Sequence, residues 1–561
     1  MNFPYFNDHP EANNVRELVS MAYTKYNGRT AFSYRKSPSD QKATEVSFQK
    51  VAYDVKCFGT EAIARNMHKA HCALIGKLSY NWIISYLSLL SVGAAVVPLD
   101  GEWSEESLAE TVKDSDCTFL ICDYEILKKV DAIRSHANIS YTLYMNDDDS
   151  FETFIESGRS RVINGDNSFS KLPIDPTKMS LIVYTSGTTG KGKGVMLSQK
   201  AILSNIAGAF QLLRVGKKTI AVLPPHHTYG STIGILAPLC GGTNVYISNG
   251  LRYLLHEFKT EKPDFMILVP LFLETFSRKI MSTIKEKKKE KLFKAMMWVN
   301  NGMRRIGIDV SEKLFSSVLS VFGGNLDMIV CGGAPLSPET IDFFSSLGIT
   351  VLNGYGITEC SPLISVNRRE DIVEGSVGVP IPCDRIKIDA AGETGEGEIC
   401  VSGPNVMLGY YKNTEATEEC IDGDGYFHTG DIGRIDEEGH LYITGRIKNL
   451  IILSNGKNVY PEEIETELSA IPGVQDIVVY EGISIRGIQH NAIVAEFYMD
   501  SDYIAKNDIV NIEEYLKPYI DKYNKTAIQY KKINIVRVRD TEFPKNTLRK
   551  IMRFKIDRTI D

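Results

Sequence analysis

The sequence predicts an α/β protein with a large N-terminal domain of helix-covered sheets, a small barrel-like β subdomain and a small α+β C-terminal domain. The chain has 561 residues, which is more than one ordinary hydrophobic core holds. Up to about residue 380, short apolar segments alternate with helical patterns, a rhythm typical of parallel sheets covered by helices. From residue 385 the strands become short and closely spaced, and helices and strands mix again after residue 446.

The first 175 residues supply strands of the predicted parallel sheet. The segment between Lys77 and Asp100 contains no charged residue and could be mistaken for a membrane span. Asn81, Gly93 and Pro98 interrupt it, so we expect a buried helix at residues 81–91 followed by a strand. The polar stretch at residues 146–175 is predicted to be a surface connection. The predicted strands lie at residues 73–76, 94–99 and 118–122.

A loop at residues 184–194 connects a predicted strand, at residues 179–183, with a predicted helix whose N-cap is Ser198. The loop contains four glycines, four Ser or Thr hydroxyls and two lysines. Glycine lets backbone amides come close to an anion, hydroxyls donate further hydrogen bonds, and lysines add positive charge. The loop therefore predicts a phosphate-binding site.

Two other interpretations of this loop are weaker. Gly187 to Lys193 fit the spacing of a nucleotide-hydrolase P-loop, but that motif needs Ser or Thr at the next position as a magnesium ligand. This chain has Gly194 there. A flexible surface loop is the remaining alternative, and the number of phosphate-binding side chains in one place disfavours it.

After the loop the α/β rhythm resumes, with strands predicted at residues 220–223, 244–247, 265–269, 328–331 and 350–352. The last two strands run into glycine-rich segments at residues 332–336 and 353–359, which we predict to be turns. In open α/β sheets ligands bind beyond the carboxyl ends of the strands, so we expect these turns to converge on one site.

The remaining chain predicts two smaller units. Strands at residues 385–388, 397–401, 433–435 and 441–443, separated by Asp- and Gly-rich turns, indicate the antiparallel, barrel-like subdomain. The last part contains a predicted helix at residues 462–470 and strands at residues 477–480, 493–498 and 533–538. It is long enough to form a small α+β domain.

Composition limits the partners. The net charge of −7 gives no basic footprint for nucleic acid. The ten cysteines form no C-x-x-C pair, and the chain does not start with an apolar run, so we expect reduced thiols and a cytoplasmic protein. Residues 285–291 contain five lysines and two glutamates. Such a run is usually a solvated helix face, and weak attraction to an anionic lipid surface is the secondary alternative, so we expect at most peripheral membrane contact.

The loop at residues 185–194 resembles the signature of the adenylate-forming superfamily, which is roughly Ser/Thr-Ser-Gly-Thr/Ser-Thr-Gly-x-Pro-Lys-Gly. This superfamily includes acyl-CoA synthetases, the adenylation domains of peptide synthetases and firefly-luciferase-like enzymes. Further segments match the family in its order, at residues 223–230, 332–336, 353–359, 428–431, 445–449 and 543–553. The doubled histidine at residues 226–227, followed by Thr-Tyr, is similar to bacterial long-chain fatty acyl-CoA synthetases.

The resemblance implies a site for ATP and Mg²⁺. Glu359, with Thr185, is expected to bind Mg²⁺ because a carboxylate is a hard oxygen ligand. Tyr355 offers a flat face to adenine, Asp431 accepts hydrogen bonds from the ribose hydroxyls, and Thr358 bonds the α-phosphate. The other implied ATP-binding residues are Ser186, Gly187, Thr188, Thr189, Gly190 and Lys193 at the phosphates, Gly333, Ala334, Pro335, Asn353 and Gly354 near the adenosine, and Arg446 beside the ribose and phosphate.

The resemblance also divides the chain into an N-terminal domain, residues 1–447, and a mobile C-terminal domain, residues 448–561, that turns about a hinge at Lys448. Lys550 is expected to bridge the attacking carboxylate and the α-phosphate, which stabilises the charge of the transition state. After the turn, Gly456 and Lys457 come to the site, where glycine leaves room for the pantetheine arm of CoA.

The implied function is an ATP-dependent ligase that joins a medium- or long-chain fatty acid to CoA through an acyl-adenylate, with His227 and Gly230 shaping the acyl channel. Because CoA and carrier proteins share a phosphopantetheine arm, a ligase that loads an acyl or peptidyl carrier protein is the alternative. A third hypothesis is a nucleotide-binding protein that has lost catalysis. It would explain two departures from the family pattern, Gly192 in place of proline and Arg549 in place of glycine. Glycine at 192 is also expected to weaken the hold on ATP.

Overall fold

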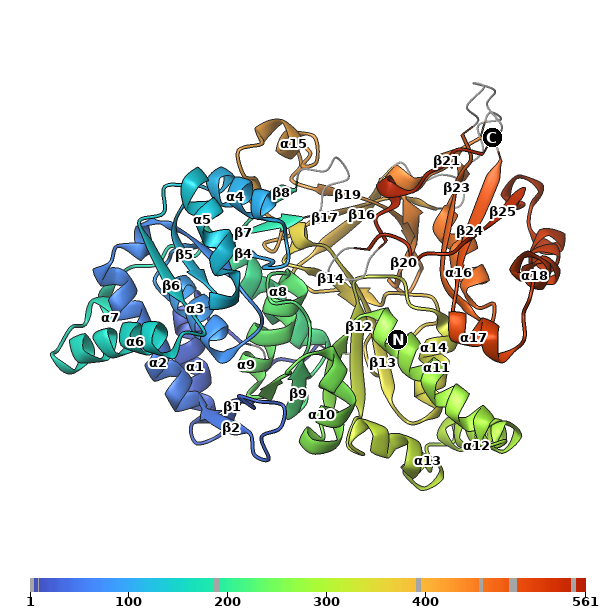
Figure 1. Cartoon of the computed structure of the whole chain (residues 1–561), viewed down its shortest axis with the longest axis horizontal. Helices are drawn as coiled ribbons and strands as arrows, with labels where there is room; N and C mark the ends of the chain where they lie inside the picture. The colour runs from blue at the N-terminus through green and yellow to red at the C-terminus, as the bar shows by residue number, and fades with distance from the viewer. Residues whose placement is uncertain are drawn as a thin grey trace.

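The computed structural model describes residues 5–8, 10–185, 192–389, 395–453, 458–483, 492–545 and 551–560. Figure 1 shows a large body and, on its right, a smaller body made of the C-terminal part of the chain, drawn in orange-red to red. No helix of the described residues is long and apolar enough to cross a membrane. The structure pairs none of the ten cysteines in a disulfide.

A seven-stranded sheet forms the first core of the large body. Its strands are β3 (His71–Ile75), β4 (Ala95–Leu99), β5 (Cys117–Cys122), β6 (Tyr141–Tyr144), β7 (Met179–Thr185), β8 (Lys193–Ser198) and β18 (Gly409–Tyr410). They lie in the order β18-β8-β7-β4-β3-β5-β6. The run from β7 to β6 is parallel, whereas β8 is antiparallel to β7 and β18. The three predicted N-terminal strands are confirmed within a residue or two.

The apolar segment before β4 is the buried helix α3 (Tyr80–Ser91). It begins after Ser79, whose side chain accepts a hydrogen bond from the backbone N–H of Trp82. Every residue from Trp82 to Ser91 is buried, which confirms the prediction of an interior helix rather than a membrane span. The neighbouring helices are α1 (Val15–Tyr26), α2 (Phe48–Ala64), α4 (Glu105–Asp114) and α5 (Leu127–His136).

The polar stretch at residues 146–175 is not a surface connection. It forms α6 (Asp148–Ile163) and the short α7 (Ser168–Lys171). α6 buries Phe151, Phe154 and Ile155, and the rings of Phe154 and Phe58 of α2 lie 4.6 Å apart. The prediction was wrong because abundant Asp and Ser on the outer face concealed an apolar stripe at helical spacing.

Two more sheets complete the α/β part. One has the order β2-β1-β10-β9 and the other β11-β12-β13-β14-β15. The strand β13 continues to Gly356 because Gly354, Tyr355 and Gly356 pair with β14, so these residues do not form the predicted turn. The strands are β1 (Thr30–Tyr34), β2 (Thr44–Ser47), β9 (Lys218–Ala221), β10 (Asn244–Ile247), β11 (Phe265–Leu268), β12 (Met328–Gly332), β13 (Thr350–Gly356), β14 (Leu363–Val366) and β15 (Val379–Pro380).

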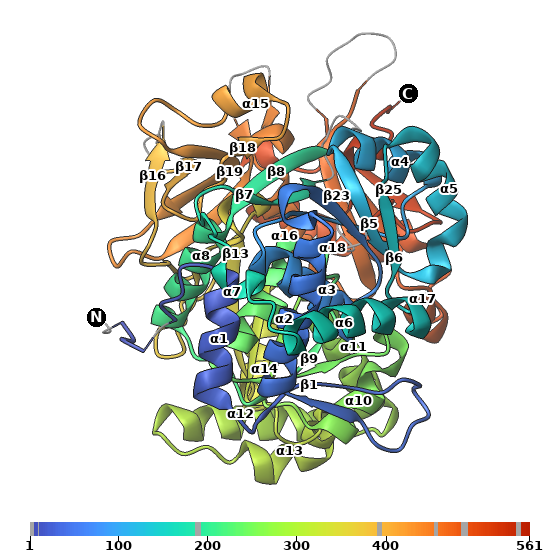
Figure 2. The ribbon, with the colours of Figure 1, turned by 90° about the vertical axis from the view of Figure 1, so that its left-hand side faces the viewer.

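Helices pack on these sheets. They are α8 (Gln199–Leu212), the π-helical segment η3 (Tyr229–Leu236), α9 (Ala237–Gly241), α10 (Leu254–Glu261), α11 (Pro270–Glu286), α12 (Glu290–Arg305), α13 (Ser311–Leu319) and α14 (Pro338–Ser346). Figures 1 and 2 both place α12 and α13 at the end of the molecule opposite α15 (Thr414–Glu418).

The predicted β subdomain is an antiparallel sheet of β16 (Arg385–Asp389), β17 (Gly397–Ser402), β19 (Phe427–Ile435) and β20 (Leu441–Arg446), in that order. The small body contains β23 (Val474–Glu481), β24 (Ile493–Met499) and β25 (Ile535–Arg539) in one sheet, with α16 (Pro461–Ser469), α17 (Ser501–Lys506) and α18 (Ile512–Thr526). It has a hydrophobic core of its own that includes Ile464, Val479, Phe497 and Leu516.

Candidate functional site

The predicted phosphate loop lies between two strands, not between a strand and a helix. β7 ends at Thr185 and β8 begins at Lys193, and these two residues are partners in the antiparallel pair. α8 starts only after β8, and the predicted N-cap is confirmed because Ser198 Oγ accepts a hydrogen bond from Ala201 N at 3.1 Å. β7 and β8 therefore form a hairpin. Of the loop's predicted ligands, Ser186, Gly187, Thr188, Thr189 and Gly190 lie outside the described residues.

Gly192 has a packing reason to be glycine. A Cβ atom added there would lie 2.7 Å from the carbonyl oxygen of Thr185, which is backbone and cannot turn away. Any residue with a side chain, proline included, would require the hairpin to shift. The departure from the family pattern is thus matched to the local shape of this hairpin.

Lys193, Tyr410 and Glu359 form a chain of contacts beside the hairpin. The ammonium group of Lys193 lies 4.6 Å from the ring centroid of Tyr410, and the Tyr410 hydroxyl donates a hydrogen bond of 2.9 Å to Glu359 Oε1. Tyr410 was not predicted from the sequence. Its position depends on the pairing of β18 with β8, which joins residues far apart in the sequence. The Gly409-Tyr410 pair was the only signal of it in the sequence.

Glu359 follows Thr358 in a short 3-10 turn (Thr358–Cys360) directly after β13. Both side chains are partly buried. Loss of water raises the pKa of Glu359, and the hydrogen bond from Tyr410 opposes this rise only in part. A carboxylate in this state gains from a nearby cation, and its hard oxygen suits Mg²⁺.

Asp431, Arg446 and Tyr355 come together at the junction of β13, β19 and β20. Arg446 Nε lies 2.6 Å from Asp431 Oδ1, and the Tyr355 hydroxyl donates a hydrogen bond of 2.7 Å to Asp431 Oδ2. The Asp431 side chain is only 2% exposed. Burial, followed by the nearby Asp431 carboxylate, raises the pKa of Tyr355, which keeps its hydroxyl a donor. Three residues predicted to bind the nucleoside thus meet at one point.

Glu398 holds the part of β19 that carries Asp431. Its Oε1 accepts a hydrogen bond from Gly430 N at 2.9 Å, and its Oε2 lies 2.8 Å from His428 Nδ1. That second contact is the main reason why the pKa of His428 is raised. Cys400 Sγ lies 3.4 Å from the same ring nitrogen. The side chains of Glu398, Cys400 and His428 are potential metal ligands. They already bond one another and the backbone N–H of Gly430, so their role is to stabilise this part of β19.

The predicted adenosine segment lies where β12 and β13 end. Gly333 has φ +88°, a left-handed conformation that favours glycine, and it is exposed together with Ala334 and Pro335. Asn353 instead faces the interior, where its backbone N–H donates to Asn367 Oδ1 at 2.9 Å and its side-chain amide to Ser376 O at 3.4 Å. These bonds give Asn353 a structural role in holding the strand end.

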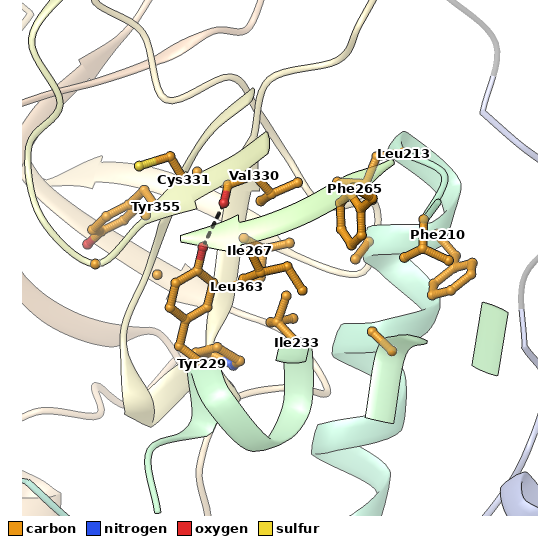
Figure 3. A pocket seen from close by; sticks show the side chains of 18 residues that line it. Phe210, Leu213, Tyr229, Ile233, Phe265, Ile267, Val330, Cys331, Tyr355 and Leu363 are labelled. Carbon is orange, nitrogen blue, oxygen red and sulfur yellow. Dashed lines mark hydrogen bonds between the residues drawn. The ribbon is translucent and has the colours of Figure 1, made fainter. Parts of the chain in front are cut away.

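An apolar pocket starts beside Gly333. It contains about 690 Å³ of empty space, a volume that includes the part open to solvent. Cys331 and Tyr355 line one end, and Phe210, Leu213 and Phe265 line the other (Figure 3). Tyr229 of η3 points into the space between them. Its hydroxyl lies 3.2 Å from each of two backbone oxygens, those of Leu268 and Val330. None of the described residues that line the pocket is charged.

The predicted acyl-channel residues lie next to this pocket and not in its lining. A Cβ atom at Gly230 would lie 2.1 Å from the carbonyl oxygen of Pro224, so only glycine fits there. Burial lowers the pKa of His227 to about 3, and the adjacent His226 adds to this effect. His227 is therefore neutral. Tyr229, directly before Gly230, lines the pocket instead, and it was not predicted from the sequence.

The predicted C-terminal residues are covered only in part. Lys448 is exposed in a short turn (Ile447–Asn449) directly after β20, a position that suits a hinge. Gly456, Lys457 and Lys550 lie outside the described residues. Lys545, five positions before Lys550, lies 2.8 Å from Asp476 and 2.7 Å from Glu542, and its side chain is 6% exposed. These ion pairs give Lys545 a structural role.

Comparisons with known proteins identify the family of the chain. The family model described as "AMP-binding enzyme" matches residues 20–411. Long-chain-fatty-acid–CoA ligase 5 of Rattus norvegicus is 28% identical over 527 residues, which cover 88% of this chain and 76% of that protein. Long-chain-fatty-acid–CoA ligase FadD15 of Mycobacterium tuberculosis is 29% identical over 425 residues, 71% of this chain and 69% of that protein.

Solved structures share the fold. ATP-bound MatB from Rhodopseudomonas palustris superposes with a TM-score of 0.75 at 23% identity, over 96% of this chain and 97% of that one. The o-succinylbenzoate CoA synthetase MenE of Bacillus subtilis, solved with its acyl-adenylate intermediate, gives a TM-score of 0.72 at 20% identity over the same shares. The family match covers more than half of the chain and includes the hairpin, Glu359 and the apolar pocket. The chain therefore belongs to the family of AMP-binding enzymes, the adenylate-forming superfamily that its motifs resemble.

Proposed function

We propose that this enzyme is an ATP-dependent ligase that joins a medium- or long-chain fatty acid to CoA, with release of AMP and pyrophosphate. The observation that carries the substrate class is the uncharged pocket between Tyr355 and Phe265. A hydrocarbon tail gains from leaving water in such a lining, whereas a second charge at the far end would be left unpaired.

The acid's orientation follows from the two ends of this pocket. Phe210, Leu213 and Phe265 close the deep end with apolar side chains. At the other end, Tyr355 and the nearby Glu359 turn offer polar groups. We propose that the carboxylate stays at this polar end, where the nucleotide phosphates also lie, and that the tail extends past Tyr229.

Adenylation turns a poor electrophile into a reactive one. The acid's oxygen attacks the α-phosphate of ATP, pyrophosphate leaves, and the acyl-adenylate that forms carries a good leaving group. Thr185 and Lys193 would hold the phosphates at the hairpin, Thr358 the α-phosphate, and Asp431 and Arg446 the ribose. Glu359, with Thr185, would hold Mg²⁺, which neutralises phosphate charge in such a displacement. Lys550 is proposed to stabilise the charge that develops between the acid and the α-phosphate.

The second step needs a different surface at the same site. The CoA thiol attacks the acyl carbon, the thioester forms, and AMP leaves. We propose that residues 448–561 turn about Lys448 between the steps, so that Lys550 leaves and Gly456 and Lys457 approach. The separate core around Val479 and Phe497, and the exposed position of Lys448, support a body that moves as a unit.

The test is ATP–pyrophosphate exchange with acids of increasing chain length, followed by thioester formation with CoA or with a phosphopantetheine-bearing carrier protein. We expect exchange with medium- or long-chain fatty acids and product with CoA. Exchange followed by transfer only to the carrier would favour the carrier-loading alternative. No exchange with any acid would favour a nucleotide-binding protein without catalysis and would contradict the proposal.

A further inference from the structure

The surface around α12 combines positive charge with exposed apolar side chains. From Arg278 to Arg305 the sequence has ten Lys or Arg residues and two acidic ones, in a chain whose net charge is −7. Both acids are engaged, since Glu286 pairs with Lys506 at 2.6 Å and Glu290 with Lys294 at 2.9 Å. Five exposed lysines form no ion pair within the described chain: Lys285, Lys287, Lys288, Lys289 and Lys291.

α12 has two apolar faces, and only one is covered. The inner face packs Phe293, Met296 and Met297 into the core shared with α11, α13 and α14. The outer face carries Leu292, Trp298 and Val299, which are 57%, 78% and 44% exposed. Ile306 and Ile308, directly after the helix, are 70% and 46% exposed. Single exposed apolar residues are ordinary, but five within one short segment indicate a contact surface.

We propose that this lysine–tryptophan face docks on a bilayer that contains anionic lipids. The face consists of the five exposed apolar residues, Leu292, Trp298, Val299, Ile306 and Ile308, and the five unpaired lysines. Tryptophan favours the boundary between headgroups and acyl chains, because its ring is apolar and its N–H is polar. Lysines beside it are attracted to anionic headgroups, a combination typical of interfacial helices.

Two other occupants fit the face less well. A symmetric dimer through α12 would bring the lysine sets of two copies together, and like charges repel. A nucleic acid would match the lysines but would leave Trp298, Leu292 and Val299 without an apolar partner. The position also suits a bilayer, since α12 and α13 form one end of the molecule in both views (Figures 1 and 2).

The inference does not need the proposed reaction, because docking can be measured without substrates. If the proposed function also holds, docking brings the enzyme to the place where apolar acids dissolve. Failure of vesicle binding would leave the exchange assay unaffected, and failure of that assay would leave vesicle binding unaffected. The two proposals can therefore be separated.

The test is flotation of the full chain with phosphatidylcholine vesicles that contain about 30% phosphatidylglycerol, against vesicles of phosphatidylcholine alone. We expect binding to the anionic vesicles that weakens as salt is raised. The triple variant Lys287→Glu, Lys288→Glu and Lys291→Glu should bind about a hundredfold more weakly. The matched control reverses three exposed lysines on α18, Lys517, Lys522 and Lys525, and should bind like the wild type.

Trp298 supplies a second readout that does not depend on charge variants. The chain has three tryptophans, and Trp82 is fully buried. Emission should shift to the blue with anionic vesicles, and Trp298→Phe should abolish the shift. Trp298→Ser should weaken binding about tenfold, in line with the loss of one interfacial aromatic. The control Ile163→Ser changes a side chain that is 72% exposed on α6 and should have no effect.

Four results would overturn the proposal. The first is equal binding of anionic and neutral vesicles, or binding to neither. The second is wild-type binding by both the triple lysine variant and Trp298→Ser. The third is a dimer by light scattering that Trp298→Ser converts to monomer, because a second copy would then occupy the face. Binding of an oligonucleotide in place of vesicles would also contradict it.

Discussion

The two sides of the site are built in different ways. On the nucleotide side, buried or partly buried charges and hydroxyls hold one another, as in the Asp431, Arg446 and Tyr355 group and in the Glu359 and Tyr410 pair. On the acyl side, apolar side chains pack around a space, and the hydroxyl of Tyr229 bonds backbone oxygens. The difference teaches that changes on the first side should alter the chemistry, whereas changes on the second should alter the choice of acid.

The largest effect is expected on the nucleotide side, for Glu359→Gln. The loss of a charged Mg²⁺ ligand should lower adenylation about a hundredfold or more, because a bound metal contributes several kcal/mol to charge stabilisation. ATP–pyrophosphate exchange measures the loss. The matched control is Glu374→Gln, which changes an exposed carboxylate, and it should leave the rate unchanged.

The same residue predicts a pH dependence. Because burial raises the pKa of Glu359, the ionised form is lost at a higher pH than for an ordinary glutamate. The exchange rate of the wild type should therefore fall on acidification while most carboxylates are still ionised. Glu359→Gln should lack this step. A step that persists unchanged in the variant would assign it to another group.

The next effect is expected on the acyl side, for Ile267→Trp. Ile267 lines the middle of the pocket (Figure 3), so a larger ring should block the deep end. We expect kcat/KM for a long-chain acid to fall about a hundredfold, since several methylene groups lose their place and each is worth about 0.8 kcal/mol. The KM for ATP and the activity with a short acid should change little. An equal loss for all acids would mean that the two sides are not separate.

A smaller effect is expected for Tyr410→Phe. The variant removes one hydrogen bond to a charged group, worth about 1.5–3 kcal/mol, so adenylation should fall about tenfold or somewhat more. Extra Mg²⁺ should restore part of the loss if the hydroxyl positions Glu359. The control is Tyr411→Phe, at the residue directly after β18. The hydroxyl of Tyr411 bonds the exposed Asp116 instead. Equal losses in the two variants would argue for a general effect on β18.

The smallest effect on activity is expected for Asp384→Asn. Asp384 is linked to the nucleotide side and to the acyl side through Asn405. Asn405 donates to Asp384 at 3.1 Å, to Cys360 O beside Glu359, and to Leu363 O in the pocket lining. Burial raises the pKa of Asp384 to about 7. A raised pKa means that its stability contribution is present below the ordinary aspartate range and is lost as pH rises through about 7. The variant should be more stable than the wild type at pH 8, by about 4 kcal/mol, and nearly equal at pH 4. Thermal unfolding at both pH values measures this, with the exposed Asp424→Asn as control.

The sequence predicted elements well where one physical pattern dominated. The buried helix α3 and the parallel strands β3, β4, β5 and β10 carry long apolar or β-branched runs, and their bounds agree within one or two residues. α6 was missed because its outer face is polar. β8 was missed because the loop before it resembled a turn into a helix, although Val195 and Leu197 alternate inward as in a strand.

The sequence predicted which motifs form the site, but it did not predict how their side chains are arranged. The order of the family motifs predicted that Glu359, Tyr355, Asp431 and Arg446 belong to one site. The structure places these residues around one region. Tyr410, Glu398 and Tyr229 were not predicted. Each acts through a partner that is distant in the sequence, and a motif read along the chain carries no information about such partners.

The most direct measurement of the central claim is a crystal structure with a stable acyl-adenylate analogue that carries a long alkyl chain. We predict that its ribose lies against Asp431 and that its tail passes Tyr229 toward Phe265. A tail that lies outside this pocket, or a nucleotide bound away from the β7–β8 hairpin, would contradict the account.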